Sequence, residues 1–156
     1  MLHLYWGNGK GKTTAAMGLA LRALGHGRRV VIVQFLKDGT SGEIALLRRC
    51  GAEVHACPNA KFTWLMTEAE RTEARQHNTA ALRAALDTPF DLLVLDEVIS
   101  ALNRGIVPME PVAAYLKAWG AEKEIVLTGR NPAQTLVDLA DYVTEMRKEK
   151  HPFDQG

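Results

Sequence analysis

Several features that mark other protein classes are scarce in this chain of 156 residues. It has two cysteines, Cys50 and Cys57, too few for a disulfide framework or a four-thiolate zinc site. Its net charge is +1, from 19 Lys and Arg against 18 Asp and Glu, so it lacks a basic field for nucleic acid or anionic lipid. No apolar run approaches the roughly 18 residues of a membrane span. These absences favour a cytoplasmic protein that binds neither nucleic acid nor a membrane.

The motifs of several enzyme classes are missing as well. The chain has no Gly-x-Ser-x-Gly elbow, no His-Glu-x-x-His pair and no protein kinase motif set. A signal peptide is not expected, because the first apolar run, Leu2–Trp6, is short and is soon followed by Lys10 and Lys12. The missing enzyme motifs leave no indication of a protein nucleophile that is activated by its own base.

The remaining composition is that of an ordinary folded protein, with 47% apolar and 24% charged residues. A length of 156 residues fits one domain, which we expect to span residues 1–156. Short apolar runs alternate with helical patterns. We expect strands at residues 2–6, 28–35, 53–57, 91–97, 124–127 and 142–146. We expect helices at residues 15–24, 41–50, 67–86 and 111–119, and one starting at Asn131-Pro132. This order predicts an α/β fold in three layers around a mostly parallel sheet.

The strongest chemical signal lies between the first strand and the first helix. Glycines there let backbone N–H groups approach phosphate oxygens, and the helix start adds partial positive charge. Lys12 is expected to reach phosphate and Thr13 to ligate Mg²⁺. The usual pattern begins with glycine where this chain has Trp6. The alternative is a glycine-rich turn with surface lysines. The predicted nucleotide-binding loop comprises Gly7, Asn8, Gly9, Lys10, Gly11, Lys12, Thr13 and Thr14.

A second signal is the apolar strand that ends in Asp96 and Glu97, which is typical of a Walker B strand. Either acid could hold Mg²⁺ directly or through water. Because neighbouring residues of a strand point to opposite faces, we do not expect both to be direct ligands. The alternative is a pair of solvated acids.

Two weaker signals follow. Arg130 follows an expected strand, at the sheet edge where open α/β sheets bind ligands. Its planar guanidinium group can bind a phosphate through two hydrogen bonds. The alternative is a surface arginine in an ion pair. Phe62 and Trp64 form an aromatic pair in a segment without clear periodicity. Such a pair can grip a flat ligand or pack on the core.

Together, these segments resemble the P-loop class of corrinoid adenosyltransferases, and the resemblance extends over nearly the whole chain in order. The matching stretches are GNGKGKTTAA (7–16), ALRALGHG (20–27), VQFLK (33–37), FTW (62–64), VLDE (94–97), LTGR (127–130), LADYVTEMR (139–147) and KHPFD (150–154).

The resemblance implies a P-loop NTPase-like fold, usually a homodimer, which transfers the 5′-deoxyadenosyl group of ATP to a Co(I) corrinoid and releases tripolyphosphate. It implies that the nucleotide lies reversed in the loop, with Lys12 as a catalytic group. Thr13 and Glu97 would support Mg²⁺ with Asp96 beside them. Arg22 and Arg130 would lie near the nucleotide. Phe62 and Trp64 are the remaining residues with an implied catalytic and corrinoid-binding role. They would pack against the corrin and displace the lower axial ligand of its cobalt.

The resemblance also implies an external electron donor, such as a reduced flavoprotein.

Two other functions remain open from the sequence. A small P-loop kinase or NTPase would release ADP. An ATP-gated corrinoid carrier would bind both ligands without turnover.

Overall fold

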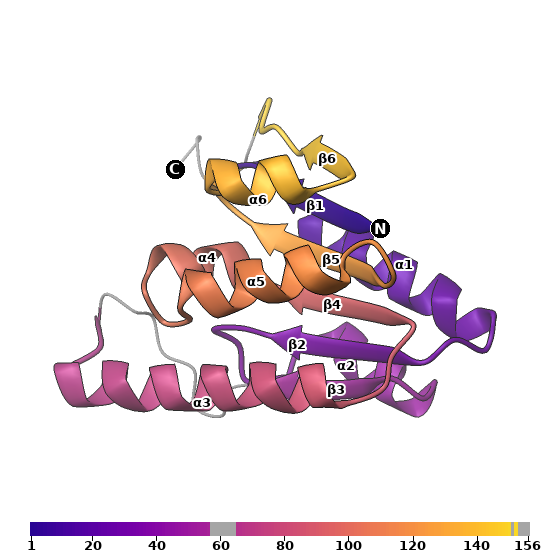
Figure 1. Cartoon of the computed structure of the whole chain (residues 1–156), viewed down its shortest axis with the longest axis horizontal. Helices are drawn as coiled ribbons and strands as arrows, with labels where there is room; N and C mark the ends of the chain where they lie inside the picture. The colour runs from indigo at the N-terminus through magenta and orange to yellow at the C-terminus, as the bar shows by residue number, and fades with distance from the viewer. Residues whose placement is uncertain (57–64, 151, 153–156) are drawn as a thin grey trace.

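The computed structural model describes residues 1–56, 65–150 and 152. Its centre is a six-stranded sheet in which every neighbouring pair is parallel (Figure 1). The strand order is β3-β2-β4-β5-β1-β6. The strands are β1 (Leu2–Trp6), β2 (Val30–Gln34), β3 (Glu53–Ala56), β4 (Leu92–Asp96), β5 (Glu124–Gly129) and β6 (Tyr142–Glu145).

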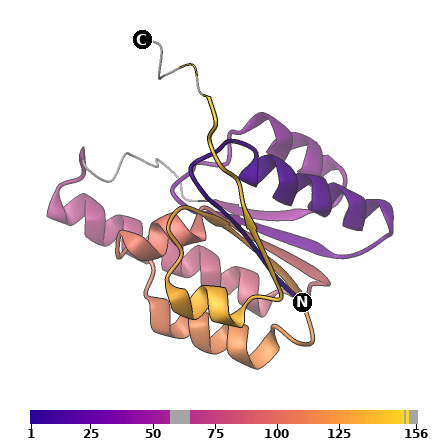
Figure 2. The same cartoon turned by 90° about the horizontal axis from the view of Figure 1, so that it is seen from above.

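Six helices connect and cover these strands. They are α1 (Lys12–Gly25), α2 (Gly42–Arg49), α3 (Glu68–Asp87), α4 (Val98–Asn103), α5 (Met109–Trp119) and α6 (Gln134–Leu139). Figure 2 shows α1 and α2 on one side of the sheet and the other helices on the opposite side. In the described part of the chain, every helix is too short or too polar to cross a bilayer.

The alternation of side chains along each strand builds the two cores. On β4, Leu93 and Leu95 join the core beneath α3, α4, α5 and α6, whereas Leu92 and Val94 join the core beneath α1 and α2. All five residues of β4 are buried, because helices cover both faces of the sheet. The expected three-layer α/β architecture is confirmed.

The sequence located most of these elements within a few residues. The long helix α3 begins with the predicted capping box, in which the Thr67 hydroxyl accepts the Glu70 N–H and the Glu70 carboxylate accepts the Thr67 N–H. Short α4 was not predicted. The predicted start of the sixth helix was wrong: it begins at Gln134, while Asn131 has a left-handed backbone with φ 52°.

Asn131 adopts this conformation because it forms a turn. The Asn103 side chain of α4 donates hydrogen bonds to the carbonyls of Arg130 and Asn131, each at 3.0 Å. Asparagine tolerates the left-handed region better than most residues. Tertiary contacts thus place Asn131 in the turn before α6 rather than at its cap.

Candidate functional site

The predicted phosphate-binding loop joins the carboxyl end of β1 to the amino end of α1. Gly7 and Gly11 have φ values of 118° and 106°, which side chains with a Cβ rarely adopt. Trp6 is the last residue of β1 and pairs with Gly129 of β5 and Glu145 of β6. The loop therefore starts at Gly7, where the strand ends. Among the described residues, no partner is found for the buried indole N–H of Trp6.

The chain that follows β6 packs directly against this loop. The Gly9 N–H donates to the carbonyl of Met146 at 2.6 Å, and the Met146 N–H donates to the carbonyl of Trp6 at 2.7 Å. The Asn8 side chain accepts the Lys148 N–H at 2.8 Å. A Cβ on Gly9 would come within 2.7 Å of the Met146 carbonyl oxygen. Glycine at this position thus allows residues 146–148 to close the loop.

Lys12 points into the cradle of the loop. Its Nζ donates to the carbonyls of Gly7 at 2.9 Å and Gly9 at 2.6 Å, and the residue is buried. Burial lowers the pKa of Lys12, as does nearby Arg130, and the carboxylates of Glu97 and Asp96 partly oppose this. An ammonium in this position can exchange carbonyl oxygens for phosphate oxygens.

Asp96, at the end of β4, is fully buried and collects donors from four segments. Its Oδ1 accepts the hydroxyls of Thr13 and Thr128, each at 2.8 Å. Its Oδ2 accepts Lys37 Nζ at 2.7 Å and Gln34 Nε2 at 3.4 Å. The carboxylate therefore ties the start of α1 to the carboxyl ends of β2, β4 and β5.

Glu97 lies just outside the strand, so the argument from strand alternation does not apply to it. It is the N-cap of α4 with φ 62°, a conformation that costs a non-glycine residue energy and is found at functional sites. Its N–H donates to the Thr128 hydroxyl at 2.8 Å, and its carboxylate accepts the Ser100 hydroxyl at 2.6 Å. Both acids act electrostatically on Lys12, so both belong to this end of the sheet.

The structure brings together most of the predicted site. Residues 7–11 join β1 to α1, and Lys12, Thr13 and Thr14 begin that helix, where the Thr13 hydroxyl donates to Asp96. Arg130 follows β5 and lowers the pKa of Lys12. Phe62 and Trp64 lie outside the described residues. No group of three or more His, Cys, Asp or Glu side chains with metal-binding geometry occurs in the described residues.

Arg22 is not brought to the loop within this chain. It lies ten residues beyond Lys12 on α1, about 15 Å along the helix axis. Its neighbours in a shallow hollow include Leu92 and Glu124, the first residues of β4 and β5. It is therefore near the opposite end of the sheet, and its role remains an expectation from resemblance.

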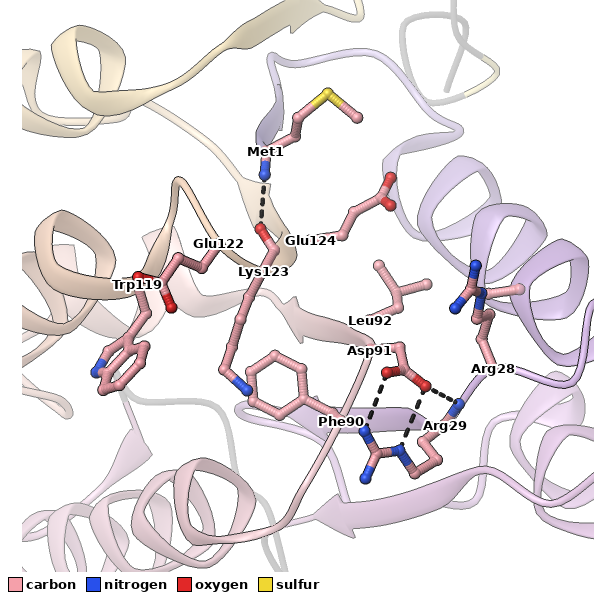
Figure 3. Close-up of a pocket in the computed structure, with 11 residues that line it drawn as sticks. Met1, Arg28, Arg29, Phe90, Asp91, Leu92, Trp119, Glu122, Lys123 and Glu124 are labelled. Atoms are coloured by element: carbon pink, nitrogen blue, oxygen red, sulfur yellow. Dashed lines mark hydrogen bonds and ion pairs between the residues drawn. The ribbon is translucent and has the colours of Figure 1, made fainter.

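A larger hollow of about 600 Å³ lies at that same amino end of the strands (Figure 3). Figure 3 shows Arg29 paired with Asp91 there, and Lys123 Nζ lies 4.5 Å from the centroid of the Phe90 ring. Parallel α/β sheets bind ligands at the carboxyl ends of their strands, so we assign the site to the loop end.

Three residues of the site had no role in our sequence-based prediction: Lys37, Gln34 and Thr128. Gln34 and Thr128 are polar residues at the ends of apolar strands, which is a usable signal for an active-site edge. Lys37 gives no such signal, because its place depends on a turn after β2.

Comparison with known proteins adds independent information. Residues 1–156 match the family model described as ATP:corrinoid adenosyltransferase BtuR/CobO/CobP. The chain is 40% identical to corrinoid adenosyltransferase CobA of Salmonella typhimurium, covering 98% of this chain and 79% of the relative. It is 39% identical to a corrinoid adenosyltransferase of Pseudomonas aeruginosa, covering 100% and 79%.

A solved structure supports the fold alone. The KaiC-like protein PH0186 of Pyrococcus horikoshii superimposes with a TM-score of 0.59 at 16% identity, covering 97% of this chain and 74% of that one.

Proposed function

The chain belongs to the ATP:corrinoid adenosyltransferase family, and from this premise we propose that it transfers the 5′-deoxyadenosyl group of ATP to the cobalt of a reduced corrinoid. The observation that carries the proposal is the assembly of loop residues 7–14 with the buried Asp96 at one edge of the sheet. This assembly suits a triphosphate.

The chemistry requires little from the protein beyond binding. The electron pair of Co(I) attacks C5′ of ATP, the Co–C bond forms, and the C5′–O bond breaks with its electrons on the leaving tripolyphosphate. Cobalt is the nucleophile, so the protein needs no activated serine or cysteine. In the described residues, no serine or cysteine is hydrogen-bonded to a histidine. Positioning and charge neutralisation remain as the contributions of the chain.

Lys12 and the loop are the proposed triphosphate-binding groups. Lys12 is buried and its ammonium is held by two loop carbonyls, so it is already directed into the cradle. When a triphosphate enters, these two weak neutral acceptors are replaced by charged oxygens, which form stronger hydrogen bonds. Arg130 adds a second cation at the same edge.

Mg²⁺ is the proposed metal, and the donor set fits it. In nucleotide enzymes Mg²⁺ takes one or two carboxylates together with phosphates and water. The Thr13 hydroxyl and the Glu97 carboxylate are the proposed ligands, and Asp96 orients Thr13 through their 2.8 Å hydrogen bond. When bound, the ion screens the charge of the triphosphate and of the leaving tripolyphosphate.

Further parts of the proposal rest on resemblance. Phe62 and Trp64 pack against the corrin and displace its lower axial ligand, which eases reduction of Co(II). A reduced flavoprotein supplies the electron. The active form is a cytoplasmic homodimer.

An anaerobic assay tests the proposed reaction. Purified protein, chemically reduced cob(I)alamin and MgATP are mixed, visible absorbance is followed, and the phosphate product is identified. We expect light-sensitive adenosylcobalamin and one tripolyphosphate for each transfer. ADP with phosphate would indicate a kinase or NTPase instead, and tight binding of both ligands without a Co–C product would indicate a carrier.

Lys12→Ala provides the matched test of the site. We expect a fall in the transfer rate of about 10² to 10³, the usual effect of removing one strong electrostatic group. Lys117→Ala is the control, because Lys117 is an exposed lysine on α5, away from the loop. Equal rates for Lys12→Ala and Lys117→Ala would exclude the loop as the site of catalysis.

A further inference from the structure

Lys37 reaches the site through an unusual turn. After β2, Phe35 is fully buried and its N–H donates to the carbonyl of Asp96 at 3.0 Å. Leu36 then has φ 57°, a left-handed conformation that is unfavourable for a branched side chain. This reversal directs Lys37 back to the end of β4 instead of outward along the strand.

Asn78 of α3 holds the turn. Its Oδ1 accepts the Leu36 N–H at 3.4 Å, and its Nδ2 donates to the carbonyl of Ala74 at 2.7 Å. Asn78 is only 1% exposed, so a buried polar side chain is used to support a strained residue. Strained backbone persists only where its surroundings impose it, and it clusters at functional sites.

The ammonium of Lys37 lies between two groups of the proposed metal site. Its Nζ is 2.7 Å from Asp96 Oδ2 and 3.4 Å from Thr13 Oγ1. The Asp96 side chain is fully buried, whereas the Lys37 side chain is 31% exposed. Among the described residues, Lys37 is the one cation within hydrogen-bond distance of Asp96. A buried carboxylate needs such a partner, since an unpaired one is costly to bury.

A divalent cation beside Thr13 changes this balance. It would bring positive charge close to Asp96, so the carboxylate would no longer depend on the ammonium. Two cations so close together repel each other. The ammonium is attached by a flexible, partly exposed stem and lies at the hydroxyl expected to meet the metal and the triphosphate. Negatively charged phosphate oxygens are the nearest alternative partners in such a complex.

We infer that Lys37 neutralises Asp96 while the site is empty and moves onto the polyphosphate when MgATP binds. This inference rests on the proposed function for the identity of the phosphate ligand. It assigns Lys37 two successive partners, and each partner gives its own measurable consequence.

Lys37→Met tests both consequences, since it removes the charge and keeps an unbranched stem. Without nucleotide, the variant should bind Mn²⁺ about tenfold more tightly than the wild type, because no ammonium beside Asp96 and Thr13 repels the ion. Its affinity for magnesium tripolyphosphate should fall about tenfold, because one phosphate-binding cation is lost. Mn²⁺ is measured by electron paramagnetic resonance and tripolyphosphate by calorimetry.

Lys37→Arg and Lys117→Met complete the experiment. Lys37→Arg keeps the charge and should retain tripolyphosphate affinity, while Lys117→Met should match the wild type in both measurements. If Lys37→Met does not fold, Lys37→Gln replaces it. Unchanged Mn²⁺ and tripolyphosphate affinities in a folded Lys37→Met variant would overturn the inference and leave a structural ion pair. Neither measurement requires adenosyl transfer, so failure of the proposed reaction is detected separately.

Discussion

The hydroxyl of Thr128, at the end of β5, donates a 2.8 Å hydrogen bond to Oδ1 of Asp96, at the end of the neighbouring β4. The same hydroxyl accepts the N–H of Glu97 at 2.8 Å. Thr128 is fully buried. The Thr128 side chain thus fixes both the buried Asp96 carboxylate and the strained backbone of Glu97.

Replacing Thr128 should therefore harm both stability and nucleotide binding. Thr128→Val keeps the shape but removes a donor to a charged acceptor and leaves the Glu97 N–H unsatisfied. We expect the free energy of unfolding to fall by about 1.5–3 kcal/mol, measured by urea denaturation. MgATP affinity should fall as well. Thr128→Ser retains the hydroxyl, so it should restore most of the MgATP affinity; equal affinity in the valine and serine variants would contradict this role.

Gly9 is the point at which the loop meets the chain after β6. In Gly9→Ala, the new Cβ would approach the Met146 carbonyl oxygen to 2.7 Å and Arg147 backbone atoms to 2.8 Å, so residues 146–148 must move away. Hydrogen exchange at the Gly9 position and at Met146 should become faster, and ATP should bind more weakly. Gly18→Ala on α1 is the control, because its Cβ meets nothing within 4 Å. Unaltered exchange at Met146 in Gly9→Ala would show that the contact is not restrictive.

The ion pair at the far end of the sheet gives a prediction for acid pH. Hydrogen bonds from the Arg29 side chain and backbone lower the pKa of Asp91 from 3.8 to about 2. Because the folded-state pKa lies below that of the unfolded chain, this contribution to stability is complete above pH 3.8 and disappears as the pH falls through about 2.

Carbon NMR of the Asp91 carboxyl group can check this value. Arg29→Ala should move the pKa of Asp91 back toward 3.8, because the side-chain hydrogen bonds are its largest cause. Arg83→Ala, which alters an exposed arginine on α3, should leave the titration curve unchanged. A midpoint that stays near 2 in Arg29→Ala would show that another group sets the pKa.

The proposed role of Trp64 separates two forms of the corrinoid substrate. Trp64→Ala should slow the reaction that starts from Co(II) with a reductant by about tenfold or more. The reaction of chemically prepared Co(I) should change less, because it needs no removal of the axial ligand. Trp119→Ala, an exposed tryptophan of α5, is the control. Equal losses in the two assays would exclude a role in axial-ligand removal.

The sequence was sufficient for those parts of the structure that depend on local chemistry. Three features depend only on neighbours in the chain, and each forms as expected. They are the glycine-rich turn before Lys12, the buried strand that ends at Asp96, and the Thr67–Glu70 capping box. The alternation of buried residues along β4 likewise follows from strand geometry.

The parts that were missed depend on tertiary contacts. Glu97 and Leu36 have left-handed backbones although neither is glycine, since Thr128 holds the first and Asn78 the second. Asp38-Gly39 indicates a turn after β2, but nothing in the sequence predicts a left-handed Leu36 or the contact of Lys37 with Asp96. Similarly, Asn131 matches a helix cap in sequence, but Asn103 from α4 holds it in a turn.

The contact between Gly9 and Met146 also affects when, during its synthesis, the protein becomes able to bind nucleotide. The two residues are 137 positions apart in the chain, so the ribosome makes the loop well before it makes the segment that supports it. At ~5–20 residues per second, the loop waits roughly 7 to 27 s for that support. A nascent chain should therefore acquire its affinity for nucleotide abruptly, as β6 emerges and joins β1, rather than gradually during synthesis.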